Sequence, residues 1–120
     1  PSSTEEALAT LAKLKTGRRK VFVLGDMLEL GERAVAAHRE IAELIAEMGL
    51  DLVLTLGELA AEAGKALIER GWGERVVITH SHDELKEALI SRLGDGRNLI
   101  LIKGSRALGL DRLVATLSRN

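Results

Sequence analysis

The sequence predicts an α/β domain of three layers, in which a mainly parallel sheet of about four strands is flanked by about five helices. Two observations support this fold class. Four short apolar runs, at residues 21–24, 52–54, 76–78 and 99–102, occur along the 120 residues, and helix-length amphipathic segments separate them. Because crossover helices cover both faces of a parallel sheet, its buried strands are apolar without alternation.

Start and stop signals mark the first two helices. Residues 3–6, Ser-Thr-Glu-Glu, form a capping box, which predicts a helix from this point to about Leu14, ended by Gly17. From about residue 32 to 48, apolar residues recur at helical spacing, and Gly49 ends this second helix.

Small side chains distinguish the third predicted helix, at about residues 58–70. Its apolar face consists of Ala60, Ala63, Gly64 and Leu67, so this helix should pack closely on the sheet. A capping box at residues 81–84, Ser-His-Asp-Glu, starts a fourth helix that ends near residue 94. A last helix is expected from about residue 109, because Leu110, Leu113, Val114 and Leu117 have helical spacing.

Alternation of these helices and strands, with right-handed crossovers, predicts a Rossmann-like domain. We expect the strand order 3-2-1-4, which sets the first and last strands side by side with the switch point between them. Ligands of such sheets bind beyond the carboxyl ends of the strands at the switch point. The loops at residues 25–31 and 103–109 are therefore the predicted ligand-binding region.

Composition allows a single domain over residues 1–120 and excludes several functions. At this length one core can bury roughly two thirds of the unfolded surface. The 17 Lys and Arg balance 18 Asp and Glu, and there is no Cys. The near-neutral charge argues against nucleic acid as a partner. The lack of Cys excludes disulfides, zinc fingers and thiol catalysis and suits a cytoplasmic protein, and no apolar run is long enough to span a membrane.

Asp26 follows the first predicted strand, inside a segment bounded by Gly25 and Gly31. A carboxylate at this position is placed to accept hydrogen bonds from ribose hydroxyls or to lie near a metal. The alternative is that Asp26 only caps the turn or the next helix.

Lys103, Gly104, Ser105 and Arg106 follow the fourth predicted strand directly. The two cations, the hydroxyl and free backbone N–H groups could hold an anion. The alternative is a solvated basic loop neutralised by neighbouring acids.

The remaining notable side chains have structural interpretations. His38 lies on the apolar stripe of the second helix, where a histidine is more often hydrogen-bonded at the core edge than a base or ligand. His80 and His82 lack partners for a metal site, and we expect none in this chain. Trp72 lies between two glycines and should anchor a loop against a helix, unless it is exposed and stacks on a ligand or a neighbouring domain.

The chain lacks the motifs that hold nucleotide phosphates. Gly64 and Lys65 are followed by Ala66 and do not form a P-loop, and G-x-G-x-x-G is missing, so the fold does not imply NAD. No Ser-His-Asp or paired-carboxylate set stands out. We therefore assign no catalytic residue within this domain, which holds half a site at most.

Several segments, in the right order, resemble the C-terminal domain of the MurF-type Mur ligases, the UDP-N-acetylmuramoyl-tripeptide:D-alanyl-D-alanine ligases. They are Val-Leu-Gly-Asp-Met-Leu-Glu-Leu-Gly at 23–31, His-Arg-Glu-Ile at 38–41, Leu-Thr-Leu-Gly-Glu-Leu at 54–59 and Leu-Ile-Lys-Gly-Ser-Arg at 101–106. Pro1 matches the end of a Tyr-Asn-Ala-Asn-Pro sequence at the entry to that domain. The resemblance therefore implies that N-terminal UDP-binding and central ATP-binding domains are absent from this chain.

The resemblance implies a cytoplasmic, ATP-dependent ligase of peptidoglycan precursor synthesis, in which this lobe closes over ATP and positions D-alanyl-D-alanine. By matched position, Asp26 would bind the ATP ribose. Lys103, Ser105 and Arg106 would line the dipeptide and phosphate side of the cleft. The P-loop and Mg²⁺ ligands would belong to the central domain, so the isolated lobe should be inactive and bind no cofactor alone.

Two other hypotheses remain open at this point. The chain could be a stand-alone Rossmann-like module that binds a small anionic ligand or a protein partner. It could also be a domain for packing or oligomerisation, although the basic loop that begins at Lys103 argues against this.

Overall fold

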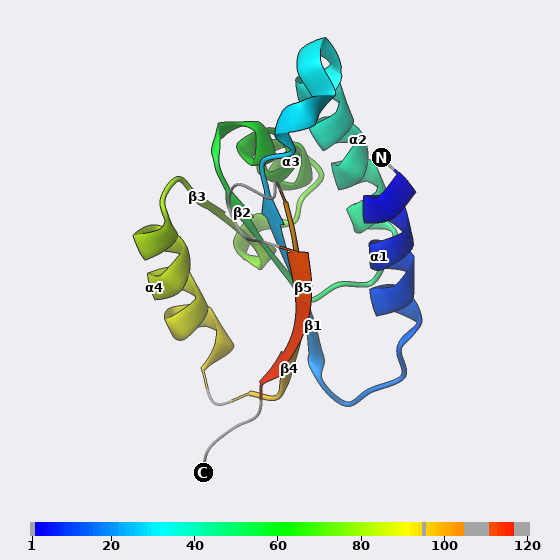
Figure 1. Ribbon diagram of the computed structural model, residues 1–120. Helices are drawn as coiled ribbons and strands as arrows, with labels where there is room; N and C mark the ends of the chain where they lie inside the picture. Colours follow the sequence, from blue (N-terminus) through cyan, green and yellow to red (C-terminus); the bar gives the residue numbers. More distant parts are fainter. Residues whose placement is uncertain (1, 95, 105–110, 117–120) are drawn as a thin grey trace.

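A five-stranded sheet lies at the centre of the structure, a computed structural model that describes residues 2–94, 96–104 and 111–116 (Figure 1). The elements in chain order are α1 (Ser2–Lys13), β1 (Arg19–Gly25), the 3₁₀ helix η1 (Leu28–Arg33), α2 (Ala34–Ala46), β2 (Leu52–Leu56), α3 (Glu58–Glu69), the 3₁₀ helix η2 (Gly73–Arg75), β3 (Val76–Thr79), α4 (His82–Leu93), β4 (Asn98–Lys103) and β5 (Asp111–Thr116). The α/β fold class is confirmed.

The strands have the order β3-β2-β1-β4-β5. β1 pairs in parallel with both β2 and β4, and β2 pairs in parallel with β3. For these four strands the expected order 3-2-1-4 is confirmed. The registers set Gly25 opposite Leu56 and Leu24 opposite Lys103, so the carboxyl ends of β1, β2 and β4 meet at one edge of the sheet.

The last element corrects the sequence prediction. Residues 111–116 form strand β5, antiparallel to β4, with Lys103 opposite Asp111 and Asn98 opposite Thr116. The prediction of a helix from about residue 109 was wrong. Only the seven residues 104–110 separate the two strands, which is too short for a parallel crossover but enough for an antiparallel return. The described ranges accordingly contain four α-helices instead of about five.

The helices form the two outer layers of the domain (Figure 1). α1, α2 and α3 cover one face, where they pack on Phe22, Leu24, Val53, Leu99 and Leu101. α4 covers the other face and contacts Val21, Val23, Leu52, Leu54 and Ile100. Burial on both faces explains why the strands are continuously apolar. Within the described ranges, no helix is both long and apolar enough to cross a membrane.

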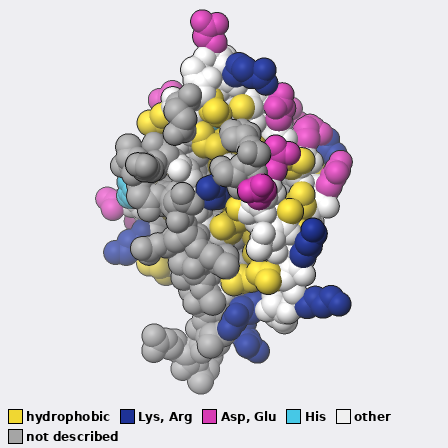
Figure 2. Space-filling view, turned by 45° about the vertical axis from the view of Figure 1, so that its right-hand side comes forward, with side chains coloured by type: hydrophobic (Ala, Val, Ile, Leu, Met, Phe, Trp, Pro, Cys, Tyr) yellow, Lys and Arg dark blue, Asp and Glu magenta, His cyan; other side chains and the backbone are white. Residues whose placement is uncertain are grey.

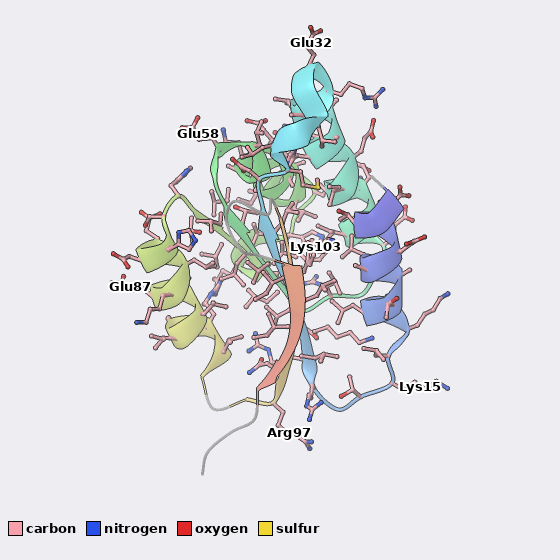
Figure 3. The ribbon with its side chains drawn as sticks, viewed as in Figure 1. Lys15, Glu32, Glu58, Glu87, Arg97 and Lys103 are labelled. Atoms are coloured by element: carbon pink, nitrogen blue, oxygen red, sulfur yellow. The ribbon has the colours of Figure 1, made fainter. Side chains whose placement is uncertain are left out.

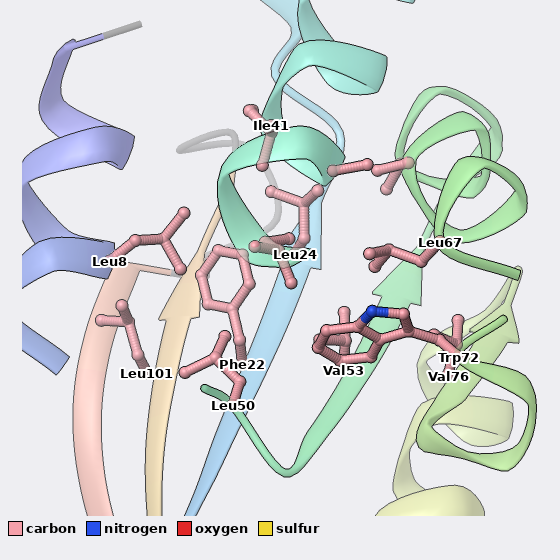
Figure 4. Close-up of a cluster of buried hydrophobic side chains, with 14 of the residues drawn as sticks. Leu8, Phe22, Leu24, Ile41, Leu50, Val53, Leu67, Trp72, Val76 and Leu101 are labelled. Carbon is pink, nitrogen blue, oxygen red and sulfur yellow. The ribbon is translucent and has the colours of Figure 1, made fainter. Parts of the chain in front are cut away.

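Two aromatic side chains anchor the larger core cluster. Figure 4 shows the fully buried Phe22 ring beside Leu8 and Leu101. Trp72 is 9% exposed and packs with Val53, Leu67 and Val76, so its expected role as a loop anchor is confirmed. The Arg75 guanidinium carbon lies 4.0 Å from the centroid of the Trp72 ring.

Helix starts were predicted with mixed success. The Ser81 hydroxyl accepts the Glu84 backbone N–H at 3.1 Å, which confirms the second capping box. α1 begins at Ser2, so Ser3 lies inside that helix and the first capping box was misplaced. The second helix was expected from about residue 32, but α2 begins at Ala34 because η1 takes the preceding turn.

Charges are unevenly distributed over the surface. On the face shown in Figure 2, acidic side chains gather in the upper part and basic side chains predominate below. The upper part of this view corresponds to the carboxyl ends of the strands, so on this face the acidic side chains lie mainly toward that edge of the sheet.

Close packing of α3 on the sheet depends on Gly64. A Cβ atom added at this position would lie 2.7 Å from Cγ1 of Ile78 and 3.4 Å from Cγ2 of Thr55. Gly64 is buried, together with Ala60, Ala63 and Leu67, which confirms the small-residue face predicted for this helix.

We expect Gly64→Val to destabilise the domain by about 1–3 kcal/mol, because overpacking must displace α3 or Ile78. Gly17→Val is the matched control, since Gly17 has no atom within 4 Å of its missing Cβ, and its effect should stay within about 0.5 kcal/mol. Urea unfolding followed by circular dichroism would measure both, and equal midpoints would contradict the packing argument.

Candidate functional site

The loops that follow β1, β2 and β4 meet at the carboxyl edge of the sheet. Asp26 follows β1, Gly57 follows β2, and Gly104 follows β4. Figure 3 shows Lys103 at the end of β4, whereas Lys15 and Arg97 lie low in this view, near the starts of β1 and β4 and thus at the opposite edge of the sheet. The structure thus brings Asp26 and Lys103 to the same edge, as the strand order predicts.

Asp26 caps a helix that is distant in sequence. Its Oδ1 atom accepts the backbone N–H of Ala60 at 2.7 Å, across 34 residues. Ala60 is the third residue of α3, and Gly57 at the N-cap of that helix has no side chain to accept this N–H. The capped helix is therefore α3, and not the turn or the next helix as the alternative interpretation of Asp26 held.

Gly57 lies directly against the Asp26 carboxylate. A Cβ atom added to Gly57 would lie 2.4 Å from Oδ1 and 2.6 Å from Oδ2 of Asp26, and the φ angle of Gly57 is +111°. Sequence reasoning missed this residue as part of the site, although it lies within the motif at 54–59.

The backbone at the start of the loop after β4 lies against the backbone at the end of β1. A Cβ atom added to Gly104 would lie 3.0 Å from Cα and 3.2 Å from N of Gly25. Lys103 is half-buried at this junction. Ser105 and Arg106 lie outside the described residues, so the anion site predicted there stays a prediction.

His38 holds the loop after β1 through a hydrogen bond to the backbone of that loop. It is fully buried, its Nδ1 lies 2.6 Å from the carbonyl oxygen of Ala34, and its Nε2 accepts the backbone N–H of Met27 at 3.1 Å. Because a carbonyl only accepts and an amide N–H only donates, Nδ1 carries the proton of a neutral ring. The expectation of a hydrogen-bonded core histidine is confirmed. The Thr4 hydroxyl donates to Sδ of Met27 at 3.4 Å, which ties α1 to the same loop.

Ion pairs between α2 and α3 hold the helix that Asp26 caps. Arg39 reaches Glu62 at 3.2 Å and Glu69 at 3.0 Å, and Arg70 reaches Glu43 at 2.6 Å. These pairs are largely exposed, so each contributes little by itself. In the part of the chain that the structure covers, no group of three His, Asp or Glu side chains is placed to bind a metal.

We expect Asp26→Ala to lower the free energy of unfolding by about 1 kcal/mol, the usual value of an N-cap. Asp26→Asn keeps an oxygen that accepts the Ala60 N–H and should lose less. Urea unfolding of the two variants would show the difference, and wild-type stability of Asp26→Ala would contradict the capping role.

His38→Phe should cost about 1–3 kcal/mol, because it leaves the buried Met27 N–H without an acceptor. His82→Phe is the matched control, since His82 is exposed, and should change stability by no more than about 0.5 kcal/mol. Equal unfolding midpoints for the two variants would show that His38 has no role in holding the loop.

Comparison with known proteins points to one family. Residues 1–106 match the family model described as Mur ligase, glutamate ligase domain. UDP-N-acetylmuramoyl-tripeptide--D-alanyl-D-alanine ligase of Bacillus subtilis is 32% identical over 98% of this chain and 25% of its own length. The ligases of the same name from Treponema pallidum and Escherichia coli are 35% and 33% identical, over 94% and 98% of this chain and 24% and 25% of theirs.

The chain spans about a quarter of the length of these curated relatives. The family match covers all the loops that meet at the carboxyl edge of the sheet as far as Arg106, including those of Asp26 and Gly57. The chain therefore belongs to the Mur ligase family, whose glutamate ligase domain it matches.

Proposed function

We propose that this chain is the C-terminal lobe of a cytoplasmic, ATP-dependent ligase that joins D-alanyl-D-alanine to UDP-N-acetylmuramoyl-tripeptide in peptidoglycan precursor synthesis. The family match and the printed names of the relatives support this proposal. Because the chain spans a quarter of those relatives, the remaining domains of the same ligase would be its first partners.

The reaction has two steps. The tripeptide carboxylate attacks the γ-phosphate of ATP, which forms an acyl phosphate and releases ADP. The amine of D-alanyl-D-alanine then attacks the acyl carbon, phosphate leaves, and the amine loses a proton as the peptide bond forms. The lobe would contribute by closing over ATP and by orienting the dipeptide, since bringing substrates together supplies much of the rate enhancement of such reactions.

The observation that carries the proposal is the held carboxylate of Asp26 beside the switch point. The Ala60 N–H occupies Oδ1, and a carboxylate has further lone pairs that can accept ribose hydroxyls. Lys103, Ser105 and Arg106 would lie on the dipeptide and phosphate side, where a cation pair suits a carboxylate or the charge of the tetrahedral intermediate.

Mg²⁺ accompanies ATP in ligases of this kind and would shield the phosphate charge. The described side chains offer no cluster of metal ligands, and the sequence has no P-loop. We therefore assign the Mg²⁺ ligands to the central domain, and no step that we attribute to this lobe depends on the ion.

In the full-length ligase, Asp26→Ala should raise the KM for ATP about tenfold or more, and Arg106→Ala should lower kcat/KM for D-alanyl-D-alanine to a similar extent, because each loses charge-assisted hydrogen bonds. Phosphate release would measure turnover. Arg97→Ala is the matched control, since Arg97 is an exposed cation at the opposite end. An unchanged KM for ATP in Asp26→Ala, together with an unchanged kcat/KM for D-alanyl-D-alanine in Arg106→Ala, would contradict the assignment.

The 120-residue chain by itself should not hydrolyse ATP, because the closed site needs the other domains. Calorimetric titration with ATP and with D-alanyl-D-alanine would test the chain alone. Sub-millimolar binding of another nucleotide, combined with no effect of Asp26 in the ligase, would favour a stand-alone module that binds a small anionic ligand.

A further inference from the structure

The carboxylate of Asp26 is held from two sides by the start of α3. The Ala60 N–H donates to Oδ1 at 2.7 Å. Gly57 lies so close to the carboxylate that a Cβ atom on residue 57 would clash with both oxygens. The first contact fixes one oxygen by a hydrogen bond, and the second requires that residue 57 has no Cβ.

Gly57 differs from the other glycines with positive φ. Gly31, Gly49, Gly71, Gly73 and Gly94 also have positive φ, but a Cβ at any of these would meet no atom within 4 Å. They serve the turn conformation alone. Among the described glycines with positive φ, only Gly57 combines that conformation with contact to a functional side chain.

We infer that Gly57 and the backbone N–H of Ala60 are the positioning groups that set the Asp26 carboxylate for the ribose hydroxyls of the nucleotide, and so determine selectivity for ribonucleotides. This inference rests on the proposed role of Asp26 in binding the ATP ribose. Oδ1 is committed to α3, which leaves Oδ2 and the remaining lone pairs of the carboxylate for the vicinal hydroxyls.

The distances explain why a small change at residue 57 should matter. Ordinary van der Waals contact begins near 3.4 Å, whereas a Cβ at residue 57 would lie 2.4 Å from Oδ1. The carboxylate would have to move by about 1 Å, which is enough to break hydrogen bonds whose donor and acceptor atoms must lie within about 2.5–3.2 Å of each other. α3 itself cannot easily yield, because Gly64 packs it against Ile78 and Thr55.

The test compares Gly57→Ala with Gly71→Ala in the full-length ligase. Gly71 has φ +92° and open space around its missing Cβ, so its variant carries similar backbone strain without contact to Asp26. For each enzyme, KM and kcat are measured with ATP and with 2′,3′-dideoxy-ATP, which lacks both ribose hydroxyls. The ratio of the two KM values reports ribose recognition, which a loss of stability alone would not change.

We expect the wild type and Gly71→Ala to prefer ATP by about tenfold or more, since charge-assisted hydrogen bonds to the hydroxyls are lost with the dideoxy analogue. Gly57→Ala should raise the KM for ATP and bring the ratio close to one, while kcat at saturating ATP stays near the wild-type value. On an Asp26→Asn background, Gly57→Ala should add no further effect, because the two residues act through one carboxylate.

If Gly57→Ala does not fold, replacement of Ala60 by its α-hydroxy acid analogue removes only the N–H and should lower the ratio several-fold. A wild-type ratio in Gly57→Ala or in the Ala60 ester would overturn the inference. If Asp26→Asn also keeps the wild-type KM ratio, the proposed contact of Asp26 with the ribose is wrong. If the ratio falls close to one in Asp26→Asn but stays at the wild-type value in Gly57→Ala and in the Ala60 ester, only the positioning role is refuted.

Discussion

Parallel pairing of β1 with both β2 and β4 is the constraint on which the rest of the structure depends. Parallel neighbours need long crossovers, and these place helices on both faces of the sheet and bury the strands completely. The same pairing brings the carboxyl ends of three strands to one edge. The buried core and the position of the candidate site therefore both follow from the parallel pairing of β1 with its two neighbours.

At that edge of the sheet, close contacts are made by the backbones of glycine residues and not by side chains. Gly104 lies against Gly25, and Gly57 lies against the carboxylate of Asp26. Because Gly57 cannot cap α3 with a side chain, the cap comes from the loop after β1. The stability of the core helix α3 and the orientation of the candidate site residue Asp26 therefore depend on the same hydrogen bond, so folding itself positions the carboxylate.

Local patterns predicted most of the fold. Continuous apolar runs identified the four parallel strands, Gly64 and its small neighbours identified close packing of α3, and Ser81 identified a helix start. The prediction of the last element failed because four apolar residues over about two turns also fit a strand, and because the short connection between Lys103 and Asp111 favours an antiparallel return over a crossover helix. The contact of Asp26 with Ala60 had no local signal, since it joins residues 34 positions apart. Such a contact follows from the strand order, which brings the ends of β1 and β2 together, and not from any spacing in the sequence.

The same geometry would suit a lobe that contributes only half of a nucleotide site, as the proposed function requires. A carboxylate that waited for its ligand in a flexible loop would lose conformational entropy on each binding event. Here Oδ1 stays bonded to Ala60, and His38 holds the adjacent Met27, so this entropy is lost once, during folding. Under the proposed function, such a lobe would meet a nucleotide held by another domain as a preformed surface, and the free energy of that contact would remain available for closing the cleft.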